Sequence, residues 1–233
     1  MTGGAPVDRR GPLSPDDLLA NPRVAIGLWV TIMAVSIWAF PRLPESVPTH
    51  FSLDGEPNAW GSRWLPLFIL PGLGAVALII VQLAREFSTT DNGRYVSGLS
   101  ANLILSSFAV VHLGIVGTLF SLPLSPMVLV TSWMGLVFVI LGRIMPQVEP
   151  NPWMGIRTAS TLGDPDVWRL THERAGPRWV WAGLGTAIAL WLLPGSWGLA
   201  VGIVLITGVS ILDVLYARKL AREKKKLSSP QGS

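Results

Sequence analysis

The chain has 233 residues, a formal net charge of +4 and no cysteine; half of its residues are hydrophobic and only 14% are charged. An average globular chain has about 25% charged residues, so this composition excludes an ordinary soluble domain and indicates a polytopic membrane protein. The lack of cysteine excludes disulfides, thiolate metal sites and a thiol nucleophile. The basic residues stand at the ends of apolar runs, which is typical of membrane topology and not of a nucleic-acid-binding face.

Residues 1–22 are polar and rich in glycine and proline, and we expect them to form a disordered N-terminal tail. Six apolar segments follow, and each is predicted to be a transmembrane helix. Their ranges are 24–40, 64–84, 99–122, 127–141, 179–193 and 197–216. Residues 217–233 form a basic and then polar tail. The sequence therefore predicts an all-α fold, in which residues 23–216 form a bundle of six transmembrane helices.

Lysine and arginine are unevenly distributed between the two ends of these spans. Sixteen of the eighteen fall in the two tails, the second connection and the central loop 143–178, which leaves only Arg42 and Arg63 for the other end. Because cytoplasmic loops carry an excess of basic residues, both termini and the central loop are predicted to be cytoplasmic. The first loop, 41–63, is then outside the cell.

The outer loop 41–63 contains a turn signal at Asp54-Gly55. His50, Asp54 and Glu56 lie close together in sequence, but their spacing matches no strong metal motif, and turn formation explains Asp54 better. We therefore expect no metal and no cofactor here.

The second half of the central loop has the signals of a short helix between spans four and five. Asp164 suits the N-cap, Pro165 suits the first helical position, and Gly176-Pro177 predicts the end of the helix. On this helix His172 and Glu173 are adjacent and point in different directions, which favours a solvated face over an acid–base pair.

The first half of the central loop, 146–163, is predicted to be ordered but irregular. Gly155 permits a turn that presents Arg157 beside Thr158. An arginine in such a place binds carboxylates or phosphates well, including those of membrane lipid headgroups.

Two ionisable residues fall inside predicted spans. A charged group at the centre of the membrane costs about 2.5–3.5 kcal/mol, so His112 is expected to face protein or water, as a neutral imidazole bonded to a serine or carbonyl of a neighbouring helix. Asp213 lies near the end of span six and is expected to pair with a nearby arginine; the sharper hypothesis is that it anchors the central loop through Arg157. The alternative function that these residues support is a small proton-coupled transporter or permease using His112 and Asp213.

Two motifs at opposite ends of the predicted bundle resemble those of one known family. The central segment Asn151-Pro152-Trp153-Met154-Gly155-Ile156-Arg157-Thr158, with Thr161-Leu162, Val167-Trp168 and Thr171-His172, is similar to the N-x-x-x-G-[IL]-R-T-P-W-T-L…V-W-x-x-[TG]-[HN] signature of SdpI-like membrane proteins. These are the immunity family for the sporulation-delaying peptide toxin. The outer segment from Leu43 to Phe51 is similar to the L-P-x-x-[IV]-P-x-H-[FW] stretch found in many members.

The resemblance implies a protein of the bacterial cytoplasmic membrane that protects the cell from an extracellular peptide toxin. It further implies a receptor that recruits a cytosolic transcriptional repressor. From the residues themselves we expect no direct binding to nucleic acid and no catalytic activity. An enzyme acting on lipid at Arg157 and His172 is the weakest alternative, because the sequence contains no recognisable pair of nucleophile and base. The implied binding residues are Asn151, Gly155, Arg157, Thr158, Trp168 and His172 in the central loop, and Pro48, His50 and Phe51 outside. The chain departs from the family at Ala159-Ser160, where Pro-Trp is usual.

Overall fold

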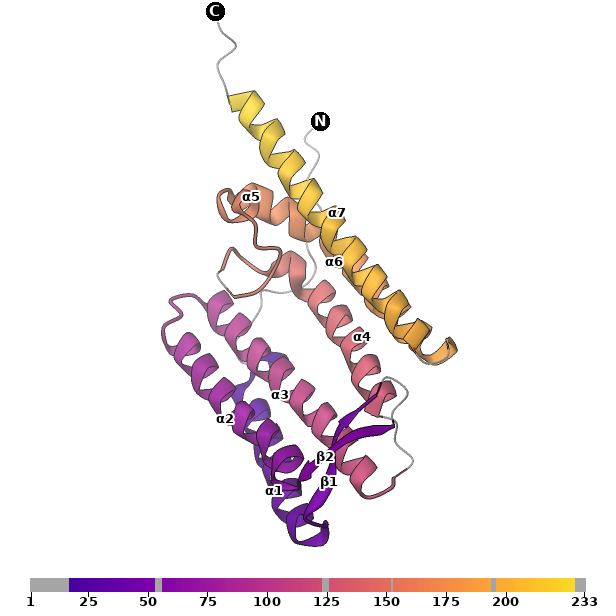
Figure 1. The fold of residues 1–233 in the computed structure, drawn as a ribbon. Coiled ribbons are helices and arrows are strands. Elements are labelled where there is room, and N and C mark those ends of the chain that lie inside the picture. The colour runs from indigo at the N-terminus through magenta and orange to yellow at the C-terminus, as the bar shows by residue number, and fades with distance from the viewer. Residues whose placement is uncertain (1–16, 53–55, 123–125, 152, 194–195, 229–233) are drawn as a thin grey trace, which may run out of the picture.

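The computed structural model describes residues 17–52, 56–122, 126–151, 153–193 and 196–228, so residues 1–16 of the predicted tail 1–22 and the Asp54-Gly55 turn lie outside it. The rest of that tail is ordered, because Leu18–Ala20 form a short 3-10 helix in which Ala20 is buried. Long helices dominate (Figure 1). Five of them are long and apolar enough to cross a membrane, which makes the chain an integral membrane protein. They are α1 (Pro22–Ala39), α2 (Trp64–Glu86), α3 (Asp91–Leu119), α4 (Pro126–Ile144) and α7 (Ser196–Ser228).

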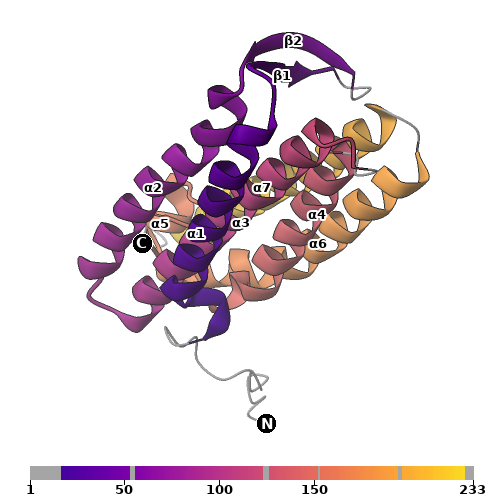
Figure 2. The ribbon, with the colours of Figure 1, turned by 90° about the horizontal axis from the view of Figure 1, so that it is seen from below.

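The helices form two groups that meet along α3 and α4. In the first group α1, α2 and α3 pack against one another; in the second α6 (Pro165–Leu192) packs between α4 and α7. Figures 1 and 2 show α6 and α7 side by side, apart from α1 and α2. The contact between α3 and α4 joins the groups.

Close approach of α4 and α6 depends on two pairs of glycines. A Cβ atom added to Gly142 would lie 2.6 Å from the carbonyl oxygen of Gly176, and one added to Gly135 would lie 2.8 Å from that of Gly183. The members of each pair are seven residues apart in both helices, so they fall on one face after two turns. Small residues at such positions let helix backbones touch inside a membrane. Gly198 and Gly202 of α7 likewise pack against α6.

The outer loop is not purely irregular, and here the all-α prediction needs correction. It contains an antiparallel hairpin of β1 (Ser46–Phe51) and β2 (Pro57–Ser62), with Val47 opposite Gly61. Pairing satisfies backbone groups that an irregular loop would leave to water. Val47 is 1% exposed and packs with Leu43, Leu67 and Val116 of α3, which holds the hairpin against the end of the bundle.

Helix ends were the least accurate part of the prediction. The short helix after Asp164 does not stop at Gly176-Pro177 but continues as α6 to Leu192. A proline removes one backbone donor, which a helix packed among others tolerates, and Gly176 serves the contact with α4 described above.

Two other helices are also longer than predicted. Helix α3 begins at Asp91, eight residues before the predicted span, and the Thr90 hydroxyl accepts the Gly93 N–H at 3.0 Å. Helix α7 extends to Ser228 and includes most of the predicted basic tail. The remaining short elements are η1 (Leu18–Ala20), η2 (Phe40–Arg42), η3 (Met145–Gln147) and α5 (Ala159–Leu162).

Candidate functional site in the central loop

Trp168 and His172 of α6 form the support on which the central loop rests. Their rings stack with centroids 4.1 Å apart, and both side chains are 1% exposed. The Trp168 indole N–H donates to the Val148 carbonyl at 2.7 Å. His172 Nδ1 lies 2.8 Å from the Trp168 carbonyl, and its Nε2 accepts the Ile156 N–H at 2.9 Å. Nδ1 therefore carries the proton and the ring is neutral.

The burial of His172 has an electrostatic consequence. Burial lowers the pKa of its imidazole below 6.5, and the hydrogen bond to the Trp168 carbonyl opposes this only in part. A neutral His172 is what the loop requires, because a protonated Nε2 could not accept from Ile156. The residue is thus a structural acceptor, and not the solvated side chain that the sequence suggested.

Gly155 and Asn151 shape the loop above this support. Gly155 has φ = 113°, and a Cβ atom there would lie 2.5 Å from His172 Nε2 and 3.1 Å from the Trp168 ring. The Asn151 side-chain oxygen accepts the N–H groups of Trp153 and Met154, each at 2.8 Å. The structure thus brings together four of the predicted site residues, which we call the loop frame: Asn151, Gly155, Trp168 and His172.

Thr158 closes the loop on the other side of Arg157. Its hydroxyl accepts the Thr161 N–H at 3.2 Å and begins α5, while the buried Thr161 hydroxyl donates to the Ile156 carbonyl at 2.6 Å. Ala159 and Ser160, which replace the family's Pro-Trp, occupy the first turn of α5.

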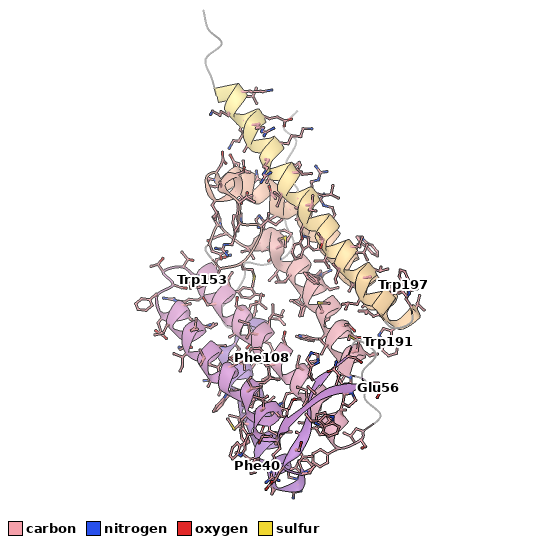
Figure 3. The ribbon with its side chains drawn as sticks, viewed as in Figure 1. Phe40, Glu56, Phe108, Trp153, Trp191 and Trp197 are labelled. Atoms are coloured by element: carbon pink, nitrogen blue, oxygen red, sulfur yellow. The ribbon has the colours of Figure 1, made fainter. Side chains whose placement is uncertain are left out.

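Arg157 lies between the turn at Gly155 and the Thr158 cap of α5, both of which are fixed by hydrogen bonds or packing. It is exposed and forms no hydrogen bond or ion pair with any residue that the structure describes. The loop therefore presents a free guanidinium, the group best suited to bidentate recognition of a carboxylate or phosphate. Trp153, 57% exposed, lies on the same loop (Figure 3).

Asn92 of α3 ties the loop to the first group of helices, and sequence reasoning missed it. Its side-chain amide donates to the Gln147 carbonyl at 2.9 Å, and its oxygen accepts the Glu149 N–H at 3.2 Å. Val96, one turn further along α3, packs against Val148 and Trp168. Asn92 is followed by Gly93, and because Asn-Gly is a common turn sequence, the local pattern does not reveal this role.

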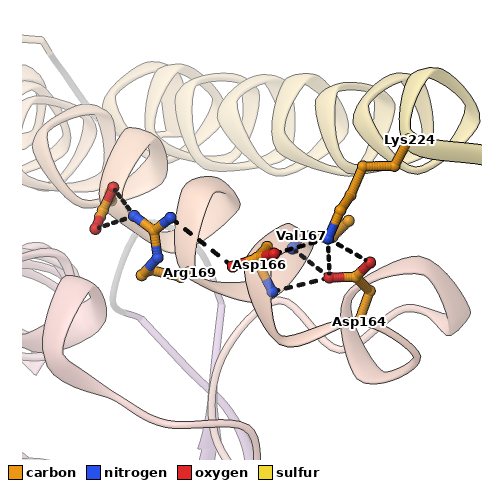
Figure 4. Close-up of polar contacts among 6 residues, drawn as sticks. Asp164, Asp166, Val167, Arg169 and Lys224 are labelled. Atoms are coloured by element: carbon orange, nitrogen blue, oxygen red, sulfur yellow. Dashed lines mark hydrogen bonds and ion pairs between the residues drawn. The ribbon is translucent and has the colours of Figure 1, made fainter. Parts of the chain in front are cut away.

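A second missed contact joins α7 to the start of α6 (Figure 4). Asp164 caps α6 by accepting the N–H groups of Asp166 and Val167, as expected from the sequence. Lys224 of α7 then donates to Asp164 Oδ2 and to Asp166 Oδ2, each at 2.8 Å. The Lys224 ammonium and the capped helix end hold the pKa of the Asp164 carboxyl below its usual value.

Asp213 pairs with an arginine, but not with the one proposed for the loop. Its carboxylate is fully buried, forms an ion pair with Arg178 of α6 and accepts the Trp179 indole N–H at 2.9 Å. Since Arg157 forms no hydrogen bond or ion pair with Asp213, the hypothesis that Asp213 anchors the loop through Arg157 is wrong.

His112 has the serine contact that the sequence predicted. Its Nε2 lies 3.1 Å from the Ser36 hydroxyl of α1, which also contacts the Leu67 carbonyl of α2 at 2.5 Å. That carbonyl is free because the residue four positions later is Pro71, which has no N–H. His112 and Asp213 thus contact different helices and share no hydrogen-bond partner among the described residues.

The outer candidates Pro48, His50 and Phe51 all lie on β1, at the end of the bundle away from the central loop (Figures 1 and 3). His50 Nδ1 lies 2.5 Å from the Asn58 side-chain oxygen, and Pro48 stands opposite Trp60, which is 64% exposed. Among the described residues no three acidic, histidine or cysteine side chains form a metal-binding group.

Comparison with known proteins matches two separate segments of the chain to two families. Residues 27–75, from within α1 to the middle of α2, match a domain of unknown function, DUF1648. Residues 147–213, which contain the loop frame, match the SdpI/YfhL protein family. No solved structure matches the chain.

Two relatives are informative. An uncharacterized protein of Archaeoglobus fulgidus is 34% identical over 88 residues, covering 36% of this chain and 47% of that protein, so the match spans about half of the relative. The Bacillus subtilis immunity protein SdpI is 26% identical over 189 residues, covering 79% of this chain and 90% of that protein. The chain belongs to the SdpI/YfhL protein family and is a distant homologue of the Bacillus immunity protein over most of its length.

Proposed function

We propose that the chain is an immunity and sensor protein of the bacterial cytoplasmic membrane, which engages an extracellular peptide toxin and signals to a cytosolic repressor. The observation that carries this proposal is the alignment with the Bacillus immunity protein, which includes 79% of this chain and 90% of that protein. A match of this extent includes both polar ends of the bundle and not the apolar helices alone.

The proposal includes a sixth membrane crossing in the second half of α6. Residues 179–193 contain no charged side chain but number fewer than the roughly 20 that a full span needs. Trp181 and Trp191, each 73% exposed, suit lipid contact there. With a sixth crossing, both termini and the central loop lie on one side of the membrane, and their excess of basic residues supports the cytoplasm as that side.

The absence of cysteine gives a direct test of this orientation. Single cysteines introduced as Ser46→Cys in the hairpin and Ala159→Cys in α5 are both at exposed positions. We expect a membrane-impermeant maleimide to label the first in intact cells and the second only after permeabilisation. Labelling of both from outside would overturn the orientation.

The hairpin end offers an aromatic surface for an amphipathic peptide. Trp60, Trp64 and Trp38 are 64%, 58% and 50% exposed, and Arg42 lies 4.7 Å from the Trp38 ring centre. Tryptophan and arginine are the side chains that most often dominate binding at interfaces.

At the other end, Arg157 is the proposed contact for the cytosolic partner. A partner carboxylate would supply the counter-charge that the described chain does not.

The function is tested in a Bacillus subtilis strain that lacks its own immunity protein and is exposed to the sporulation-delaying peptide. We expect the chain to restore growth, Trp60→Ala to lose protection, and Trp181→Ala, an exposed tryptophan far from the hairpin, to retain it.

Arg157→Ala should retain protection and lose only the repressor response, whereas Arg169→Ala, whose charge is already paired with Glu173, should retain both. Failure of the unmodified, expressed chain to protect would refute the immunity function.

A further inference from the structure

An apolar cavity opens between α1, α2 and α3 near the end that carries the central loop. Its volume is about 360 Å³, within the range of about 300–1,000 Å³ that small-molecule sites occupy. The lining is aliphatic apart from two polar side chains from the last turns of α2, Gln82 and Arg85. Apolar residues that line it include Ile26 of α1, Ile79 and Leu83 of α2, and Ala101 of α3.

Arg85 stands at the polar end of this cavity with most of its hydrogen-bonding capacity unused. Its Nη1 donates to the backbone carbonyls of Ala20 and Arg94, at 3.3 and 3.4 Å. No carboxylate of the described residues lies within ion-pair distance of it, and its Nε and Nη2 have no acceptor there. A guanidinium carries five N–H donors, so the remaining donors and the full positive charge are available to a ligand.

The position of Arg85 is fixed by the packing around it. A Cβ atom on Gly98 of α3 would lie 2.0 Å from the Ala20 carbonyl oxygen and 3.0 Å from Arg85 Nη1, so only glycine lets these groups meet. Asn102 of α3 donates to the neighbouring Leu19 carbonyl at 2.8 Å and holds the same turn. The guanidinium is therefore anchored at one edge and open at the other.

The depth of the site matches the boundary between lipid tails and headgroups. Phe87, 81% exposed, follows α2 directly, and Trp153 of the central loop is 57% exposed beside the end of α2 (Figure 3). Exposed aromatic side chains at the end of a span mark the membrane interface.

We propose that this cavity binds an anionic phospholipid of the leaflet on the central-loop side, with one acyl chain between α1, α2 and α3 and the phosphate on Arg85. The aliphatic lining suits an acyl chain, and the unpaired guanidinium suits a phosphate with an unneutralised negative charge. A zwitterionic lipid would bring its own cation to the same place. A free phosphate would leave the aliphatic part of the cavity empty.

The experiment is native mass spectrometry of the full chain in detergent, titrated with dioleoylphosphatidylglycerol and, separately, with dioleoylphosphatidylcholine. We expect the anionic lipid to bind about tenfold more tightly, in keeping with the strength of a hydrogen bond between charged groups. Arg85→Gln should remove that preference. The matched control is Arg23→Gln. Arg23 is an exposed residue at the start of α1, on the same side of the bundle as Arg85, and it does not line the cavity.

A second pair of variants tests the acyl-chain part without altering Arg85. Ile79→Trp fills the cavity from an exposed position and should reduce phosphatidylglycerol binding severalfold, whereas Ile203→Trp on α7 should not. Inorganic phosphate at millimolar concentration should fail to compete. Equal binding of the two lipids, equal loss in Arg85→Gln and Arg23→Gln, unchanged binding in Ile79→Trp, or displacement by phosphate alone would each overturn the proposal.

Discussion

Gly155→Ala tests whether the loop frame holds Arg157 in place. The new Cβ would lie 2.5 Å from His172 Nε2 and would have to adopt φ = 113°. Such a backbone conformation costs a residue other than glycine about 1–3 kcal/mol. Displacing His172 leaves the buried Ile156 N–H without an acceptor, which costs about 1–3 kcal/mol more. We expect a local destabilisation of about 3 kcal/mol.

The assay is hydrogen exchange of the Ile156 amide in the purified chain, because this amide reports opening of the frame directly. At about 1.4 kcal/mol per factor of ten, the expected cost corresponds to exchange roughly a hundredfold faster. Gly208→Ala is the control, since no atom lies within 4 Å of the added Cβ and alanine is a better helix former.

A double-mutant cycle separates the two contributions. In a His172→Ala background the clash with the imidazole is gone and only the looser contact with Trp168 remains, so Gly155→Ala should cost mainly the backbone term, about 1–3 kcal/mol. Exchange of the Ile156 amide in Gly155→Ala as slow as in Gly208→Ala would refute the reasoning.

Three further predictions follow from buried polar groups. Burial lowers the pKa of the His172 imidazole below 6.5, so the folded loop should be fully stable above pH 6.5 and should lose stability as the pH falls below this value. The loss is measured as reduced protection of the Ile156 amide from hydrogen exchange, after correction for the intrinsic exchange rate. Asp213→Asn should destabilise the chain in detergent by about 3 kcal/mol, measured by thermal unfolding, because it leaves the Arg178 charge without its partner. Ser36→Ala should cost about 1–3 kcal/mol in the same assay, because it leaves the carbonyl freed by the α2 proline without a donor.

Each of the last two has a matched control. Asp91→Asn changes an acidic side chain that is 74% exposed, and its thermal unfolding should stay within about 0.5 kcal/mol of the unmodified chain. Ser100→Ala removes a hydroxyl that bonds only to Val96 of its own helix. Equal effects of Ser36→Ala and Ser100→Ala would contradict the role given to Ser36.

The sequence was sufficient for the apolar helices and for the cap at Asp164, because both depend on local composition. Gly176-Pro177 misled because its glycine serves contact with α4, which no local pattern reveals. The hairpin was missed for a related reason, since Val47 is buried by Leu43, Leu67 and Val116, which lie on different segments.

The candidate site was predictable in its residues and not in their physical roles. Asn151, Gly155, Trp168 and His172 stood out through resemblance, and the structure brings all four together. Their spacing alone does not say that Trp168 and His172 support the loop while Arg157 stays free. Whether the family's binding role extends to each of them stays a prediction. The partners of Asp164 and Asp213, Lys224 and Arg178, lie 60 and 35 residues away in the chain, beyond the reach of any short motif.

Helix α3 touches both polar ends of the molecule: Val116 packs beneath the hairpin, and Asn92 and Val96 contact the central loop. Its 29 residues contain no proline and run for about 43 Å as one helix. Coupling of binding sites is reciprocal. If a peptide at the hairpin changes the loop through α3, then a protein bound at the loop must alter the affinity of the hairpin for the peptide by the same factor. A cell that makes more of the cytosolic partner would thereby change the concentration of extracellular peptide to which it responds.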